Sequence, residues 1–182
     1  MFLKSKLYQF GKYTWSQIDY LVSVEGYIPV ASAEEFANLK ISDTQTMGVG
    51  SRWEGSYTTG LDKKYVQVNN IDFEAYIDGV GNKLSPIGSS ISFTGVYDGN
   101  NLRLDNIYMS YVWDNNAVFG VIENATLKNI LIRNAYVYQR NVSRKNAVVF
   151  TTATNCEIYN IVVVDSTAGG YSHSSGLGVY SY

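Results

Sequence analysis

The stretch that decides the fold reads, from residue 125 to residue 132, Ala125-Thr126-Leu127-Lys128-Asn129-Ile130-Leu131-Ile132. Counted from the asparagine, apolar residues stand at positions −4, −2, +1 and +3. Each half alternates as a strand with one apolar face does, but the alternation slips by one residue between the halves. A bend at Asn129 resolves the slip, because asparagine tolerates the left-handed backbone conformation of a tight corner. The pattern therefore predicts two short strands on either side of a corner.

The same arrangement surrounds three further asparagine–isoleucine pairs. The four pairs are Asn70-Ile71, Asn106-Ile107, Asn129-Ile130 and Asn160-Ile161. They are 36, 23 and 31 residues apart, and all sixteen positions at these offsets are apolar. Repeats of this length with short strands predict a parallel β-solenoid, in which the four asparagines stack as a corner ladder and the four isoleucines form core rungs. Four antiparallel hairpins, with asparagine merely marking the turns, are the alternative interpretation.

Composition narrows the possible functions. The 182 residues carry 14 basic and 16 acidic side chains, so no basic surface for nucleic acid is expected. One cysteine, Cys156, and one histidine, His173, argue against a disulfide framework, a metal site and histidine acid–base chemistry. No run of 18 apolar residues is present, so no membrane span is expected. We therefore expect a β-rich protein without cofactor, metal site or catalytic residues.

Three segments are expected along the chain. Residues 1–29 mix aromatic residues and lysines without a clear period, and we interpret them as an N-terminal attachment or leader segment. Residues 30–64 are predicted to form a capping helix and a loop, because Ser32 and Glu35 fit a capping box. Residues 65–182 hold the repeats. These are expected to continue beyond residue 182 in a longer chain, because a further corner would be due there.

Three strings within the repeats are distinctive: Ser85-Pro86-Ile87-Gly88, Phe93-Thr94-Gly95-Val96-Tyr97-Asp98-Gly99-Asn100, and Val118-Phe119-Gly120. With the stretch at 125–130, they make residues 28–182 resemble the GLUG-motif repeat family. The resemblance implies an all-β, right-handed parallel β-helix, as in bacteriophage tail proteins and bacterial adhesin stalks. It also implies a scaffold without shared catalytic residues. The chain departs from the family's pattern at Thr151, which follows Phe150 where glycine is expected.

These features predict a non-enzymatic structural subunit of a phage virion, such as a tail fibre, tailspike or baseplate appendage. Residues 1–29 would bind other virion or surface-assembly proteins, and the rigid β-helix would project toward host receptors, among them a cell-surface glycan. The chain begins at Met1 without a recognisable secretion signal, which favours the virion over the bacterial cell surface. A homo-oligomer is expected, with a trimer as one arrangement. The alternatives are a bacterial adhesin stalk and a β-helical polysaccharide depolymerase whose active site lies outside this segment.

Few residues suggest chemistry. Asp72 and Glu74 would share a strand face roughly 6.5–7 Å apart, a spacing seen in polysaccharide-cleaving carboxylate pairs. Solvated surface charge is the simpler interpretation of both. Several of the 16 tyrosines could stack on sugar rings or pack against partner chains, or they reflect the strand propensity of tyrosine. These are Tyr108, Tyr111, Tyr136, Tyr138, Tyr159, Tyr171, Tyr180 and Tyr182.

Overall fold

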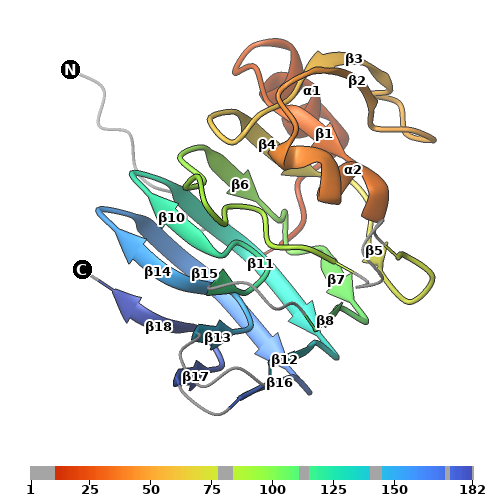
Figure 1. Ribbon diagram of the computed structural model, residues 1–182. Helices are drawn as coiled ribbons and strands as arrows, with labels where there is room; N and C mark the ends of the chain where they lie inside the picture. Colours follow the sequence, from red (N-terminus) through yellow and green to blue (C-terminus); the bar gives the residue numbers. More distant parts are fainter. Residues whose placement is uncertain (1–10, 78–83, 111–114, 140–144, 171–172, 182) are drawn as a thin grey trace.

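The computed structural model describes residues 11–77, 84–110, 115–139, 145–170 and 173–181. Two helices and a hairpin lie at one end of the molecule, and the strands from the last third of the chain lie at the other (Figure 1). The helices are α1 (Trp15–Ser23) and α2 (Ala33–Ala37), and a 3-10 turn, η1 (Asn38–Lys40), follows α2. Within the described ranges, no helix is long and apolar enough to cross a membrane.

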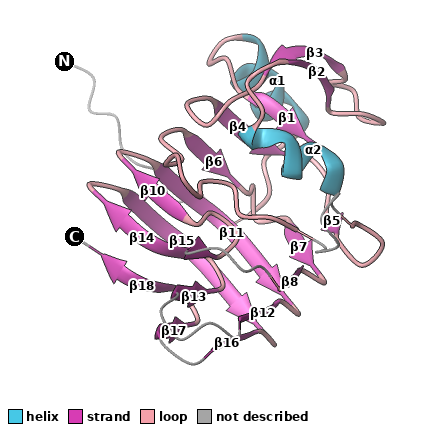
Figure 2. Cartoon of the chain, viewed as in Figure 1, coloured by secondary structure: helices cyan, strands magenta, loops and turns pink. Residues whose placement is uncertain are grey.

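Parallel strands make up most of the fold (Figure 2). The largest sheet has the order β1 (Ile28–Val30), β4 (Lys64–Gln67), β6 (Val96–Asp98), β11 (Thr126–Arg133), β7 (Arg103–Asp105) and β5 (Ile71–Asp72), with β15 (Glu157–Val164) also paired to β11. Three smaller sheets contain β10 (Val121–Glu123), β14 (Phe150–Thr154) and β18 (Gly178–Ser181); β16 (Thr167–Gly170), β12 (Tyr136–Gln139) and β8 (Tyr108–Met109); and β17 (His173–Ser175), β13 (Lys145–Ala147) and β9 (Asn115–Asn116). The hairpin of β2 (Thr44–Met47) and β3 (Gly55–Thr58) is the one antiparallel pair among the described strands.

The prediction of an all-β, right-handed parallel β-helix is wrong. Strands make up 43% and helices 11% of the structure, and a seven-stranded parallel sheet with small sheets beside it replaces a closed solenoid in the described ranges. The architecture is therefore of mixed α/β character. The reason lies at the predicted corner, because Asn129 sits inside β11 and does not end it. Pairing with β15 continues on both sides of this residue, from Lys128 opposite Tyr159 to Ile130 opposite Ile161.

The register of the strands also differs from the predicted one. Leu104 stands opposite Ile132, whereas the alignment of asparagine–isoleucine pairs would place it opposite Leu127. Tyr97 takes the place opposite Leu127. A shift of five residues turns offsets −4 and −2 into +1 and +3, so the apolar spacing fits both registers equally well. The parallel pairing between 65 and 164 also excludes the alternative of four antiparallel hairpins.

Helix α2 covers one end of the core and begins as predicted. The Ser32 side chain accepts a hydrogen bond from the Glu35 backbone N–H at 3.2 Å. The buried Glu35 carboxylate does not complete a capping box, because it accepts the backbone N–H groups of Ala31, Gly48 and Val49 instead. The bonds from Gly48 and Val49 attach α2 to the β2–β3 hairpin, in a region where the sequence predicted a loop.

The Phe36 ring joins α2 to the sheet. It meets the rings of Phe73, Tyr97 and Phe119 edge-on, with centroids 5.5, 5.3 and 5.9 Å away. All four side chains are fully buried. Edge-on aromatic pairs stabilise a core beyond the area that they bury, so this cluster holds the helix on the strand ends.

The N-terminal segment contributes to the fold where it is described. Helix α1 begins with a reciprocal capping box between Thr14 and Gln17, a helix signal within the segment 1–29 that was predicted to be an attachment or leader segment. Ile18 of α1 is 3% exposed. The predicted boundary after residue 29 falls inside β1, which pairs with β4. At least residues 15–30 therefore belong to the packed structure.

Candidate functional site

A column of asparagine side chains runs across the strands beside β11. The side-chain amide of Asn160 donates hydrogen bonds to the side-chain oxygens of Asn129 at 2.8 Å and Asn101 at 2.9 Å. The amide of Asn129 donates in turn to the Asp98 carboxylate at 2.9 Å. All three asparagines have a left-handed backbone, with φ between 54° and 55°. Asparagine suits these positions for two reasons, because it tolerates the left-handed backbone and its side-chain amide bonds to the next strand.

The four asparagines predicted to form one ladder are divided among different places. Asn129 and Asn160 share the column just described. Asn106 belongs to a second column, where it accepts a hydrogen bond from Asn134 at 2.7 Å and donates to Asp72 at 2.9 Å. The Asn70 side chain accepts the Arg103 backbone N–H at 3.0 Å. The single ladder was wrong for the same reason as the register, because Asn106 aligns with Asn134 and not with Asn129.

The predicted core rungs differ in how far they are covered. Ile71, Ile107 and Ile130 are 2%, 1% and 1% exposed, whereas Ile161 is only half-buried. Ile130 and Ile161 are register partners, and Ile71 pairs instead with Leu104. Ile161 is less covered because β15 is paired on one side only among the described strands.

A buried carboxylate anchors the N-terminal segment to the sheet. Asp98 is fully buried and accepts hydrogen bonds from the Tyr13 hydroxyl at 2.8 Å and from the Asn100 backbone N–H at 3.0 Å. The Asp98 carboxylate also accepts a hydrogen bond from the Asn129 side-chain amide, and the Lys128 ammonium lies 3.0 Å from it. Burial and the negative charge of Asp98 raise the pKa of Tyr13 well above its usual range. Burial opposes the charge of Lys128, but Asp98, Tyr27 and Tyr13 together raise its pKa.

The other carboxylates singled out from the sequence are also engaged in structure. Asp72 accepts hydrogen bonds from the Glu74 backbone N–H and from the Asn106 side-chain amide, both at 2.9 Å. Asp105 is buried between the guanidinium groups of Arg103 and Arg133, at 2.9 and 3.0 Å. In the described part of the chain, no three His, Cys, Asp or Glu side chains gather as metal ligands would.

Tyrosine occurs both in the core and on the surface. Tyr65 and Tyr97 are fully buried, and burial raises the pKa of Tyr65 to about 12. Tyr108 and Tyr136 lie on adjacent strands with stacked rings 5.5 Å apart, and their side chains are 40% and 43% exposed. Stacking along the strands accounts for part of the tyrosine surplus that the sequence left unexplained. The predictions about the His173 side chain fall outside what the structure describes.

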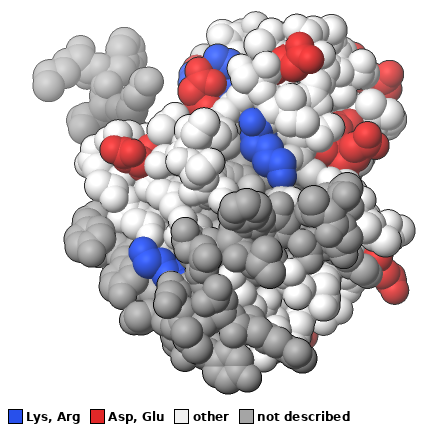
Figure 3. Space-filling model, viewed as in Figure 1, with Lys and Arg blue, Asp and Glu red and all other residues white. Residues whose placement is uncertain are grey.

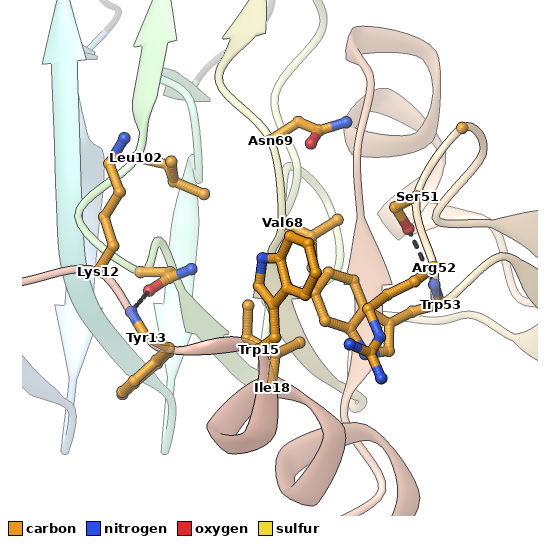
Figure 4. Close-up of a pocket in the computed structure, with 12 residues that line it drawn as sticks. Lys12, Tyr13, Trp15, Ile18, Ser51, Arg52, Trp53, Val68, Asn69 and Leu102 are labelled. Carbon is orange, nitrogen blue, oxygen red and sulfur yellow. Dashed lines mark hydrogen bonds between the residues drawn. The ribbon is translucent and has the colours of Figure 1, made fainter.

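A cleft of about 510 Å³ lies beside the anchored N-terminal segment (Figure 4). Trp15, at the start of α1, stands between two walls. Lys12 and Leu102 are on one side, and the β2–β3 turn with Arg52 and Trp53 is on the other. Trp15 lies among the aromatic residues of segment 1–29, and nothing in the sequence connects it with Arg52 and Trp53, which are 37 and 38 residues further along the chain. On the face of the molecule drawn in Figure 3, acidic and basic side chains are scattered over the described residues.

Comparison with protein-family models, curated proteins and solved structures finds no significant match to this chain. The resemblance to GLUG-motif repeats therefore stays a prediction from the residues that carry it.

Proposed function

We propose that this protein is a non-enzymatic structural subunit of a multi-protein appendage, such as the tail fibre, spike or baseplate appendage of a phage virion. The observation that carries the proposal is the stack of parallel strands, joined in register by backbone bonds and by side-chain bonds such as that from Asn160 to Asn129. Such a stack resists deformation because its inner strands are bonded to neighbouring strands on both sides. A rigid element of this kind suits a part that transmits force or holds other parts at a distance.

The last strand of the stack supports an assembled state. Leu127 and Ile130 of β11 are 0% and 1% exposed, but their register partners on β15, Ile158 and Ile161, are only half-buried. An edge strand with partly exposed apolar side chains favours the addition of another strand. We infer that a neighbouring subunit covers this edge, in a homo-oligomer or with another appendage protein.

The use of the carboxylates favours a structural over a catalytic role. Asp98, Asp105 and Glu35 are all buried and bonded to donors that hold the fold together. Asp72 accepts hydrogen bonds from the Glu74 backbone N–H and from the Asn106 side-chain amide. A glycosidase-type mechanism requires two carboxylates facing a shared open site, and these side chains are committed elsewhere.

The location of the protein tests this proposal directly. An antibody raised against the purified chain, followed by gold labelling of phage particles and cells from the source culture, should mark virion appendages. Labelling of the cell envelope would favour the adhesin-stalk alternative. Labelling confined to the cytosol would contradict a structural role in either appendage.

The edge of β15 is tested by mutation. Val162 and Val164 on β15 are 46% and 39% exposed, so the double change Val162→Lys, Val164→Lys should leave the monomer folded while blocking a partner. Light scattering after size-exclusion chromatography should show an oligomer for the wild type and a monomer for the double variant. Ile91→Lys, at an apolar position 70% exposed away from this edge, is the matched control and should keep the oligomer. A monomeric wild type would contradict self-assembly.

A further inference from the structure

The cleft beside α1 displays an aromatic surface that the structural role does not use. The Trp15 side chain is 70% exposed, the same exposed fraction as Ile91 and larger than that of any other aromatic residue described. Its indole points into the cleft between the two walls (Figure 4). A large aromatic group held in water at the mouth of a cleft is typical of ligand sites, where the ring offers a flat apolar surface.

One wall of the cleft is held in place by Asp19 of α1. Its carboxylate accepts hydrogen bonds from the Trp53 ring N–H at 2.8 Å and from the Arg52 guanidinium at 2.9 Å. The Arg52 guanidinium carbon then lies 5.5 Å from the Trp15 ring centroid and 5.6 Å from that of Trp53. Both contacts orient the guanidinium, whose side chain stays 48% exposed and keeps donors for a ligand. The wall is therefore organised before any ligand arrives.

The opposite wall adds charge and hydrogen-bonding capacity. Lys12 and Asn69 are both exposed beside the cleft, whereas Asn100 is already bonded to the backbone of Tyr13 and Gln67. The charged side chains that line the cleft are Lys12 and Arg52, and both are cationic. The cleft thus combines a flat apolar ring, the exposed Lys12 ammonium, the Arg52 guanidinium paired with Asp19, and an exposed amide.

We propose that this cleft binds an acidic saccharide, with a sugar ring against Trp15 and a carboxylate bonded to Arg52, while Lys12 on the opposite wall adds positive charge. The apolar C–H face of a pyranose ring matches an indole, and guanidinium is the preferred partner of a carboxylate. The volume of about 510 Å³ falls within the range of about 300–1,000 Å³ typical of small-ligand sites. The proposal is independent of the structural role, because it concerns the N-terminal end of the molecule and not the edge of β15.

Binding of trigalacturonate to the full chain tests the proposal, with its methyl ester as the neutral probe of the same shape. Calorimetry and tryptophan fluorescence should show that trigalacturonate binds at least about tenfold more tightly than its methyl ester. Added salt should weaken the binding of trigalacturonate. Sialyllactose against lactose repeats the comparison with a second acidic sugar. A mononucleotide serves as an anionic probe of another class. The proposal would be overturned if trigalacturonate and its methyl ester bound equally well, or if neither trigalacturonate nor sialyllactose bound. It would also be overturned if the mononucleotide bound more tightly than both acidic sugars.

Three substitutions assign the binding to the cleft. Trp15→Ala, Arg52→Gln and Lys12→Gln should each weaken trigalacturonate binding, by about tenfold or more for the first two. Tyr20→Ala is the matched control, since Tyr20 is an aromatic residue of the same helix, 53% exposed, and outside this cleft. Lys12→Gln keeps the test decisive if either of the other variants misfolds, because Lys12 is exposed. Undiminished binding by a folded Trp15→Ala variant would overturn the assignment.

Discussion

The side-chain amide of Asn160 donates a hydrogen bond of 2.8 Å to the side-chain oxygen of Asn129, one strand away in the stack. Both residues hold a left-handed backbone, with φ of 54° and 55°. Each asparagine therefore has two roles, because it supplies an unusual conformation at low cost and links its strand to the next one. The strands on either side of such a residue stay in register while their side chains change face.

Replacement of Asn129 should separate these two roles. Asn129→Ala should lower the free energy of unfolding by about 2–3 kcal/mol, because it loses the amide bonds and strains the backbone. Asn129→Gly should lower the free energy of unfolding by a smaller amount, because glycine adopts the left-handed conformation without strain. Urea denaturation measures both values. Asn69→Ala, at an exposed asparagine without positive φ, should change stability by less than about 0.5 kcal/mol. Equal losses for Ala and Gly would show that the conformation contributes nothing.

Burial of a charge should distinguish the inner strand from the edge strand. Ile130→Asp should unfold the protein, because an unpaired carboxylate at a position 1% exposed costs several kcal/mol. Ile161 is the register partner of Ile130 on β15, and its side chain is only half-buried. Ile161→Asp should therefore leave a folded protein with a lower melting temperature. Circular dichroism melting curves compare the two. A larger loss at residue 161 than at residue 130 would contradict the assignment of β15 to the edge.

Gly120 should be intolerant of any side chain. It has φ of 55°, and a Cβ atom there would collide with the backbone oxygen of Gly88. Gly26 has φ of 72° but open space around it, so Gly26→Ala should pay only the conformational cost of about 1–2 kcal/mol. Gly120→Ala should cost clearly more, as measured by urea denaturation. Similar losses for the two variants would show that the backbone at residue 120 moves aside freely.

Stability should decline at alkaline pH. Burial raises the pKa of Tyr65 to about 12, above its ordinary value of 10. The unfolded chain therefore releases this proton first, and the stabilisation present below pH 10 is lost as pH rises toward 12. Tyr13 and Lys128, whose pKa values are also raised, act in the same direction.

Urea midpoints measured from pH 7 to pH 12 check this prediction. The wild type should lose stability above pH 10, and Tyr65→Phe should lose it less steeply there. Between pH 7 and pH 9 the two proteins should show the same slope, which serves as the internal control. An unchanged slope above pH 10 in Tyr65→Phe would contradict the role of this hydroxyl.

Part of the local structure followed from particular residues. The Ser32 hydroxyl caps α2 as its spacing from Glu35 predicts, and Ile71, Ile107 and Ile130 are buried as their alternation predicts. The box of Thr14 and Gln17 was equally readable and marks the start of α1. The cleft was not predictable, because Trp15 and Arg52 meet only through the packing of α1 against the hairpin.

The alternation of apolar and polar residues by itself determined that the described residues between 65 and 164 form strands with buried faces, because water excludes apolar side chains wherever they lie in the chain. The tertiary structure alone decided which strands pair and in which register, since the apolar pattern coincides with itself after a shift of five residues. The choice depends on directional bonds between distant residues, such as Asn160 with Asn129 and Tyr13 with Asp98. Such bonds form only once the strands are already side by side, which is why the order of side chains along the chain does not reveal them.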